Sequence, residues 1–193
     1  MNLESIASIR NAKSFCLSNF FDSSPFINYD FFKLLEDTEC TSKLSGWIPE
    51  HFILKEGKEI VGFIPNFKKL NSMGEYIFDH MFEHAYYQLG SNYFPKFLSG
   101  IPFTPVTKLK FLYSNKELNT EKIIKLLILF VKESKVSSFH ANFLNFETSK
   151  KLETHNLIQR VGIQYHWKNR SFRDFQCFLD SMKSRKKKSI QKE

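Results

Sequence analysis

The sequence has little glycine, proline or cysteine and no long hydrophobic run. Only 7 of its 193 residues are glycine and 6 are proline, which excludes collagen-like chains and low-complexity linkers. Its three cysteines, Cys16, Cys40 and Cys177, form no C-x-x-C pair, so we expect reduced thiols. The longest apolar run, 123–131, contains Lys125 and falls far short of the about 20 residues of a membrane span. Because the N-terminus also lacks a signal peptide, the sequence predicts a cytoplasmic protein without a membrane span.

The motifs of the common hydrolases and nucleotide-binding proteins are absent as well. There is no glycine-rich phosphate loop, no G-x-S-x-G elbow and no Cys/His pair at a useful spacing. One short motif, His80-Met81-Phe82-Glu83-His84, fits the H-x-x-E-H pattern of inverted zinc peptidases. His80 and His84 lie one helical turn apart and could hold a metal, with Glu83 as a base. No third ligand follows, so the alternative is a pair of surface histidines, and we expect no bound metal.

What the sequence does contain is typical of a globular protein with a basic end. The hydrophobic fraction is 42% and the charged fraction 25%, and the length suits one domain, or one domain and the start of a second. The net charge is +8, of which residues 183–193 contribute +5 through six positive residues and one negative residue. The basic character therefore belongs to one terminal element. This element is either a solvated, frayed end or a nucleic-acid-binding segment.

Helical and strand-like patterns alternate along the chain. Helices are expected at 29–37, from Asp79 as N-cap to Leu89, at 121–134 with Thr120 as N-cap, at 148–154 and at 172–192. Strands are expected at 51–55 and 59–67, which form a hairpin, and at 74–78, 137–143 and 157–167. A weak strand or helix start followed by a helix is expected over 6–20, and a strand followed by a proline-rich loop over 93–106. This order predicts an α/β (α+β) fold in which helices cover a mixed sheet on both faces.

Two regions offer polar side chains suited to proton transfer. Glu75 and Asp79 stand at the junction of a predicted strand and helix, where sheet edges open into ligand crevices, so either could act as a general base. A plain helix cap is the alternative for Asp79. His166, on the predicted strand 157–167, could be catalytic or contact a substrate, and a hydrogen-bonded structural histidine is its alternative. We predict that Glu75, Asp79 and His166 converge in one cleft.

Three stretches together resemble one known family. They are Gly74-Glu75-Tyr76-Ile77-Phe78-Asp79-His80 with Ala85-Tyr86, Tyr93-Phe94-Pro95-Lys96 with Ile101-Pro102-Phe103-Thr104-Pro105-Val106, and Gly162 to Trp167 through Ser184-Arg185-Lys186-Lys187-Lys188. Shorter matches are Ser24-Pro25-Phe26, Gly46-Trp47 and Ser137-Ser138-Phe139-His140. In order and spacing these motifs resemble the bacterial FemAB-like proteins, a peptidoglycan biosynthesis or recognition family of the acyl-CoA N-acyltransferase superfamily.

The resemblance implies a GNAT-like fold and an N-acyltransferase activity. It implies that residues 1–171 are the N-terminal GNAT-like half of a two-domain architecture, truncated where a basic helix, 172–193, leads to an absent second domain that another chain could supply. An acyl or aminoacyl group would pass from acyl-CoA or aminoacyl-tRNA, with no permanently bound cofactor, to a peptidoglycan precursor or another amine acceptor. The alternative is a non-catalytic module that binds a cell-wall precursor or a partner chain.

On this hypothesis the site residues fall into two groups. The polar groups that line the cleft and carry the catalysis are expected to be Glu75, Asp79 and His166. The walls that bind the substrate are expected to be Tyr76, Phe103, Thr104 and Trp167. No metal ligand is expected among them.

Overall fold

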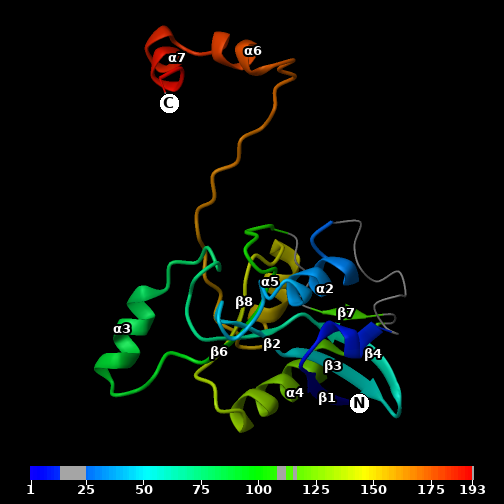
Figure 1. Ribbon diagram of the computed structural model, residues 1–193. Coiled ribbons are helices and arrows are strands. Elements are labelled where there is room, and N and C mark those ends of the chain that lie inside the picture. The colour runs from blue at the N-terminus through cyan, green and yellow to red at the C-terminus, as the bar shows by residue number, and fades with distance from the viewer. Residues whose placement is uncertain (14–24, 108–111, 115–116, 193) are drawn as a thin grey trace. The chain divides into compact units, whose positions relative to one another are not determined.

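The computed structural model describes residues 1–13, 25–107, 112–114 and 117–192 (Figure 1). It divides into two compact units, residues 1–159 and 160–193, which we describe separately. Cys16, Ser24 and the part of the predicted 6–20 element beyond residue 13 lie outside the described residues. The two cysteines inside them, Cys40 and Cys177, form no disulfide.

The first sheet of unit 1–159 is antiparallel, with the strand order β1-β3-β4-β7. Its strands are β1 (Asn2–Ile6), β3 (His51–Glu56), β4 (Glu59–Ile64) and β7 (Tyr113–Ser114). β3 and β4 pair through Glu56 and Glu59, and Gly57 between them takes φ 61°, a left-handed conformation that a tight hairpin turn needs. The predicted hairpin is therefore confirmed.

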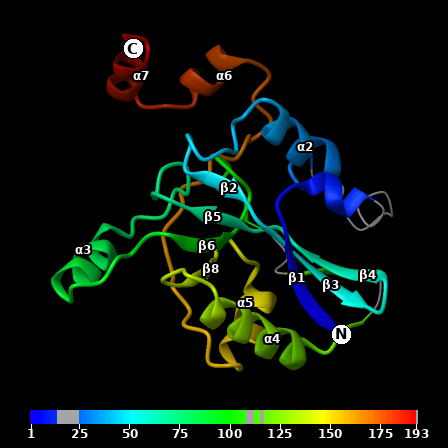
Figure 2. The ribbon, with the colours of Figure 1, turned by 60° about the horizontal axis from the view of Figure 1, so that its bottom comes forward.

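The second sheet is mixed and has the order β2-β5-β6-β8. Its strands are β2 (Trp47–Pro49), β5 (Phe67–Lys69), β6 (Lys96–Ser99) and β8 (Phe139–Ala141). The pairs β2·β5 and β5·β6 are antiparallel, whereas β6 and β8 are parallel. Figure 2 shows these four strands in one stack with β1, β3 and β4 beside them. The mixed α/β class is as predicted, but the strands are divided between two sheets.

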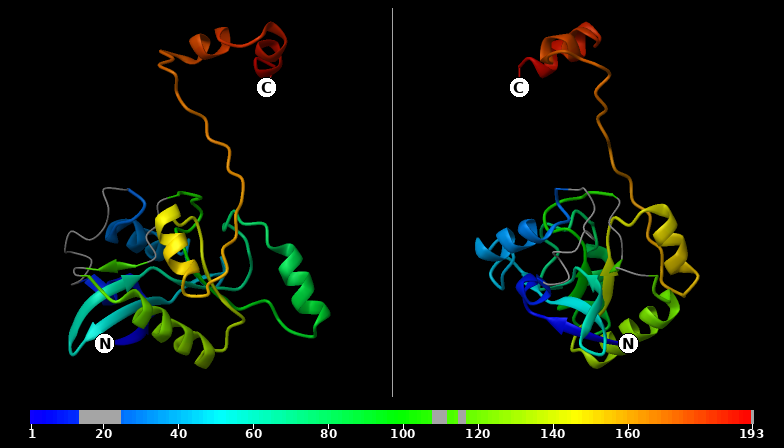
Figure 3. Two further views of the ribbon diagram at one scale, coloured as in Figure 1. Left: turned by 180° about the vertical axis from the view of Figure 1, so that it is seen from behind. Right: turned by 90° about the vertical axis from the view of Figure 1, so that its right-hand side faces the viewer.

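Among the described residues of this unit there are also five helical elements. They are η1 (Ile9–Ala12), α2 (Tyr29–Asp37), α3 (His80–Gln88), α4 (Thr120–Glu133) and α5 (Phe146–Glu153). α2, α4 and α5 each begin at an asparagine whose side chain accepts a hydrogen bond from a backbone N–H three residues later, which is a standard N-cap. The cap of α4 is Asn119, so the predicted cap at Thr120 is wrong by one residue. α3 buries none of its residues and projects from the unit in Figure 1 and in the left view of Figure 3.

The buried apolar side chains of this unit form two cores. One lies between α2, η1 and both sheets and contains Phe32, Trp47, Phe63 and Phe67. The other lies under α4 and contains Phe52, Phe97, Ile123, Ile124 and Leu127. Aromatic side chains bury large apolar areas and pack edge to face, as Trp47 does with Phe67 in the first core and Phe52 with Phe97 in the second.

Three predicted elements differ in the structure. Residues 74–78 form a turn followed by an irregular segment rather than a strand, because Gly74 and Tyr76 both take left-handed backbone conformations. Residues 157–167 are extended but pair with no strand among the described residues, so their alternating apolar side chains are exposed. The predicted helix 172–192 is two short helices, α6 (Phe175–Asp180) and α7 (Ser184–Ile190).

Candidate functional site

The second sheet places two lysines side by side in the interior of unit 1–159. Lys69 on β5 and Lys96 on β6 are direct register partners, and each is 0% exposed. A buried ammonium group is costly unless charged or hydrogen-bonding partners compensate it. The groups around these two amines therefore define the most unusual chemical environment in this unit.

Lys96 is compensated by two carboxylates. Its Nζ lies 2.9 Å from Oε2 of Glu75 and 2.5 Å from Oδ2 of Asp79. The hydroxyl of Tyr93 donates to the same Asp79 oxygen at 2.7 Å. Both carboxylates are buried, so these four residues form one ion network shielded from solvent.

Lys69 is held by a carbonyl and an aromatic ring. Its Nζ donates to the carbonyl oxygen of Met73 at 3.1 Å and lies 3.7 Å from the centroid of the Trp47 ring, a cation-π contact. Nε1 of Trp47 donates to the same carbonyl at 2.9 Å. Two buried side chains thus fix the backbone just before Glu75.

The turn around Glu75 is built from left-handed residues. Gly74 has φ 73° and Tyr76 has φ 55°, and such a conformation is unfavourable for a tyrosine. Phe103 packs directly on Gly74, since a Cβ at that position would lie 2.5 Å from a Phe103 ring carbon. This turn brings the Glu75 carboxylate to Lys96 while the Tyr76 side chain stays exposed.

The network shifts the pKa values of its members in different directions. Burial lowers the pKa of Lys69 to about 7, and the charge of Lys96 adds to this effect while Glu75 opposes it. Burial raises the pKa of Glu75 more than Lys96 lowers it. Burial also acts to raise the pKa of Asp79, but hydrogen bonds, led by that of Lys96, lower it to about 2. At neutral pH Asp79 is therefore a fixed anion, whereas Glu75 is the better proton acceptor.

The second carboxylate oxygen of Glu75 differs from the one that contacts Lys96. The second oxygen, Oε1, is buried and makes no hydrogen bond within the described part of the chain. Buried carboxylate oxygens are normally hydrogen-bonded. Oδ1 of Asp79 is also buried without a hydrogen bond in the described part of the chain, but the pKa of Asp79 is lowered whereas that of Glu75 is raised. Glu75 Oε1 is therefore the oxygen better suited to accept a further proton.

The structure brings together two of the three predicted catalytic residues. Glu75 and Asp79 meet on Lys96, as their proximity in the sequence suggested. Asp79 precedes α3 but its side chain makes no cap hydrogen bond, because it faces Lys96 and Tyr93. His166 belongs to unit 160–193, where its Nε2 lies 2.8 Å from the side-chain oxygen of Gln164. The predicted convergence of His166 with the carboxylates stays a prediction.

The predicted wall residues are likewise divided between the units. In unit 1–159, Tyr76 is 58% exposed and Phe103 is 39% exposed. The ring of Phe103 lies 5.4 Å from that of Trp47, which links it to Lys69. Thr104 is half-buried, and its hydroxyl donates to the Pro102 carbonyl at 3.1 Å.

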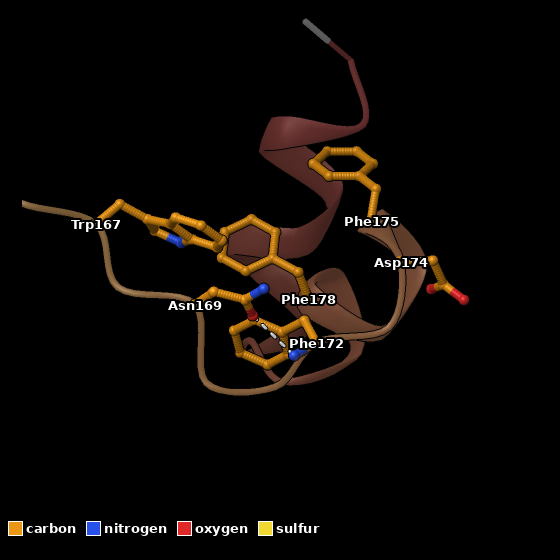
Figure 4. Close-up of a pocket in the computed structure, with 6 residues that line it drawn as sticks. All are labelled: Trp167, Asn169, Phe172, Asp174, Phe175 and Phe178. Atoms are coloured by element: carbon orange, nitrogen blue, oxygen red, sulfur yellow. Dashed lines mark hydrogen bonds between the residues drawn. The ribbon is translucent and has the colours of Figure 1, made fainter. Parts of the chain in front are cut away.

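Trp167 lies in unit 160–193, where it lines a pocket. The pocket has a volume of about 460 Å³ and is lined by Trp167, Asn169, Phe172, Asp174, Phe175 and Phe178 (Figure 4). Phe172 stacks on the indole with ring centroids 6.5 Å apart, and Phe178 meets it edge to face at 5.9 Å. Trp167 thus lines a pocket, and this pocket belongs to unit 160–193. Its predicted role as a wall residue beside Glu75 stays a prediction.

The sequence analysis did not name Lys69, Tyr93 or Lys96 as site residues, although Tyr93 and Lys96 lie in a stretch that carries the family resemblance. Lysine is rarely buried, so a lysine in a short strand is first assigned to solvent. A signal was nevertheless present for Lys96, which precedes the apolar residues Phe97 and Leu98 on a strand buried throughout. Lys69 follows another lysine, Lys68, and has no such signal. A strand that buries both faces leaves no room for a solvated lysine.

A second polar cluster has the composition of a hydrolytic triad but not its geometry. The Ser8 hydroxyl donates to Oε2 of Glu36 at 2.5 Å, and Nε2 of His51 lies 3.3 Å from Oε1 of the same carboxylate. The other ring nitrogen of His51 accepts from the Asn66 backbone at 3.2 Å. Serine and histidine thus contact opposite oxygens of one glutamate rather than each other, so the cluster joins η1, α2 and β3 without activating a nucleophile.

The H-x-x-E-H motif lies on the exposed helix α3. His84 contacts Gln88 through its Nε2 at 2.9 Å. Throughout the described residues, no three His, Cys, Asp or Glu side chains are grouped so as to hold a metal ion, and no helix there is long and apolar enough to cross a membrane. The expectation that no metal is bound at His80 and His84 stays a prediction.

Comparison with known proteins identifies the family. Residues 5–193 match the family model of the FemAB-like proteins, described as peptidoglycan biosynthesis/recognition. The chain belongs to the FemAB-like family. No curated protein and no solved structure matched the sequence significantly. Two of the stretches that carry the resemblance, 74–80 and 93–96, supply the network of this FemAB-like protein through Glu75, Asp79, Tyr93 and Lys96.

Proposed function

We propose that this FemAB-like protein transfers an acyl or aminoacyl group to an amine of a peptidoglycan precursor, with Glu75 as the general base. The observation that supports this most is the environment of Glu75: a raised pKa and a buried oxygen without a hydrogen-bond partner in the described residues. A base of raised pKa suits proton abstraction near neutral pH. Family membership supplies the connection with peptidoglycan.

The chemistry requires one proton acceptor at the attacking amine. As the amine nitrogen bonds to the acyl carbon, the bond from that carbon to the donor's sulfur or ribose oxygen breaks and the nitrogen loses a proton. Glu75 would take this proton and return it to the leaving thiolate or alkoxide. Lys96 would hold Glu75 in position through the 2.9 Å contact, and Asp79 would hold Lys96 in place through the 2.5 Å contact. Lys96 and Asp79 are thus positioning residues.

The donor in this proposal is acyl-CoA or aminoacyl-tRNA, used as a substrate rather than as a bound cofactor. Both donors are polyanions, which a protein of net charge +8 attracts. The exposed rings of Tyr76 and Phe103 beside the 73–76 turn would form the apolar wall next to Glu75. Thr104, in the same unit as Glu75, is proposed to line the same site.

A second candidate function is recognition of the precursor without catalysis. It is favoured by the burial of the network: Glu75, Asp79 and Lys96 are each 3% exposed or less. In that case the ion network would serve to fix the 73–79 turn. Tyr76 and Phe103 would then contact the ligand as a rigid surface.

One experiment distinguishes the two functions. Purified protein is incubated with a muropeptide that carries a free amine and with either acyl-CoA or aminoacyl-tRNA, and the products are analysed by mass spectrometry. The transferase predicts an acylated muropeptide and a loss of about 10²-fold or more in Glu75→Gln, with muropeptide binding retained. The matched control is Glu83→Gln on the exposed helix α3. Muropeptide binding without product would establish recognition. The absence of both product and binding would refute both functions.

A further inference from the structure

Unit 160–193 carries almost all of the protein's net charge. It contains ten lysine and arginine residues against three acidic residues, so it accounts for +7 of the +8 of the whole chain. The remaining 159 residues are nearly neutral. Most of these basic side chains are exposed, including Arg170, Arg173, Arg185, Lys186 and Lys188. Such a concentration of charge on one small unit is the electrostatic signature of a surface that binds polyanions.

The same unit exposes an aromatic pocket. Trp167 is 65% exposed and Phe175 is 63% exposed, although both contact the cluster formed by Phe172 and Phe178. Figure 4 shows the indole at one side of the pocket with the phenylalanine rings around it. A planar ring can therefore stack on the indole without displacing a core residue.

The polar groups of the pocket suit a heterocycle. The indole N–H of Trp167 and the amide of Asn169 provide hydrogen-bond donors, and the Asn169 oxygen is already occupied by the Phe172 backbone N–H at 2.8 Å. Asp174 caps α6 through the Cys177 backbone N–H and pairs with Arg173. Its charge is thus balanced within the unit and opposes an incoming anion only weakly.

We infer that unit 160–193 is a binding site for single-stranded nucleic acid, in which an unpaired base stacks on Trp167 while the surrounding lysines and arginines contact the phosphates. Proteins that bind single strands combine these two features, a basic surface and exposed aromatic rings. The inference concerns binding and holds whether or not Glu75 is a catalytic base.

The observations favour a nucleic acid over an anionic membrane. A helix that binds at a lipid surface needs a continuous apolar face. In α7 the basic residues are accompanied by only one large apolar side chain, Ile190, and none of its residues is buried. The basic residues also extend well beyond this helix, to Lys168, Arg170 and Arg173, as expected for a surface that follows a strand of phosphates.

Fluorescence titration of the full chain tests the site directly. Trp47 is buried and Trp167 exposed, so quenching by a 12-nucleotide oligouridylate should report on Trp167. Trp167→Ala is expected to weaken binding, followed by anisotropy of a labelled oligouridylate, by about tenfold or more, and Trp167→Phe by less. Oligothymidylate distinguishes DNA from RNA as the preferred strand.

The charge contribution is tested by a triple substitution of exposed residues, Arg185→Gln, Lys186→Gln and Lys188→Gln. It spares Lys187, which pairs with Asp180. If all three contact phosphates, the slope of log affinity against log salt concentration should decrease in magnitude by about 2. The matched control removes three exposed lysines from unit 1–159, Lys122→Gln, Lys132→Gln and Lys135→Gln, and should leave the slope unchanged.

Three outcomes would overturn the inference. They are no binding to either oligonucleotide at 50 mM salt, an equal loss of affinity in the triple variant and its control, and binding to phosphatidylglycerol vesicles without binding to oligonucleotides. Each can be observed without any acyl donor or acceptor. A failure of this site and a failure of the proposed transferase activity are therefore distinguishable.

Discussion

Lys69 and Lys96 face each other on the antiparallel strands β5 and β6, and neither is exposed to solvent. Like charges directly opposite each other destabilise a sheet, and burial makes the conflict more severe. The surroundings of the two lysines reduce this repulsion in different ways. Lys96 receives both Asp79 and Glu75 as partners, whereas burial lowers the pKa of Lys69 to about 7. Lys96 is thus paired with two carboxylates, whereas Lys69 is poised to lose its proton.

The first prediction concerns the compensated lysine. Lys96→Met leaves Asp79 and Glu75 buried without their cation, and removal of one partner from a buried ion network costs about 3–5 kcal/mol. Urea denaturation at pH 7 should show this loss in the free energy of unfolding. The matched control is Lys68→Met on β5, whose side chain is partly exposed and pairs with Glu50. It should cost about 1 kcal/mol or less. Equal losses in the two variants would contradict the proposed network.

The second prediction concerns the pH dependence that Lys69 creates. Its pKa is about 7 in the folded protein and 10.5 as the reference value, so between these values the unfolded chain binds a proton that the folded protein lacks. The free energy of unfolding therefore rises with pH across this window. Lys69→Met removes the proton-binding group, so the stability of the wild type relative to this variant should increase from pH 7 to pH 9. Urea denaturation at pH 7, 8 and 9 measures the difference.

Lys68→Met again provides the control, because it removes a lysine from the same strand and leaves Lys69 in place. It should retain the rise of stability with pH that Lys69→Met loses. If the wild type and Lys69→Met instead show parallel pH profiles, Lys69 is protonated equally in the folded and unfolded chains. The conclusion that burial lowers the pKa of Lys69 would then be wrong.

Local patterns in the sequence were sufficient for the helices α2, α4 and α5 and for the hairpin. α2, α4 and α5 begin within two residues of their predicted starts, because an asparagine cap and an apolar stripe are both encoded within a few neighbouring residues. The prediction of a strand over 157–167 was wrong for the opposite reason. The alternating pattern of this segment describes one side of a pair, but no strand within the described residues pairs with it. Strand formation depends on a partner that the segment itself does not specify.

The candidate site shows a similar division. Glu75 and Asp79 were identifiable because they are close in sequence and stand before a helix. Lys96 lies 21 residues from Glu75 and 17 from Asp79, and only the pairing of β5 with β6 brings Lys69 beside it. The turn at 74–76 was missed because the sequence Gly74-Glu75-Tyr76 does not reveal that Tyr76 adopts a left-handed conformation. These relations arise from tertiary structure and have no local signal.

The third prediction concerns the turn that positions Glu75. Gly74→Ala introduces a Cβ 2.5 Å from the Phe103 ring at a residue with φ 73°. Both the backbone strain and the clash destabilise the fold, by about 3 kcal/mol or more together. Urea denaturation measures this loss. Near-ultraviolet circular dichroism should also change, because Phe103 packs on Trp47.

Gly90→Ala separates the two contributions. Gly90 has a similar φ of 70°, but a Cβ there would meet nothing within 4 Å, so this variant carries the backbone strain alone, about 1–2 kcal/mol. Adding Phe103→Ala to Gly74→Ala should recover the part of the loss that comes from the clash, because the smaller side chain leaves room for the new Cβ. A Gly74→Ala variant no less stable than Gly90→Ala would show that Phe103 yields readily. In that case close packing against Phe103 would not be what holds the Glu75 turn in place.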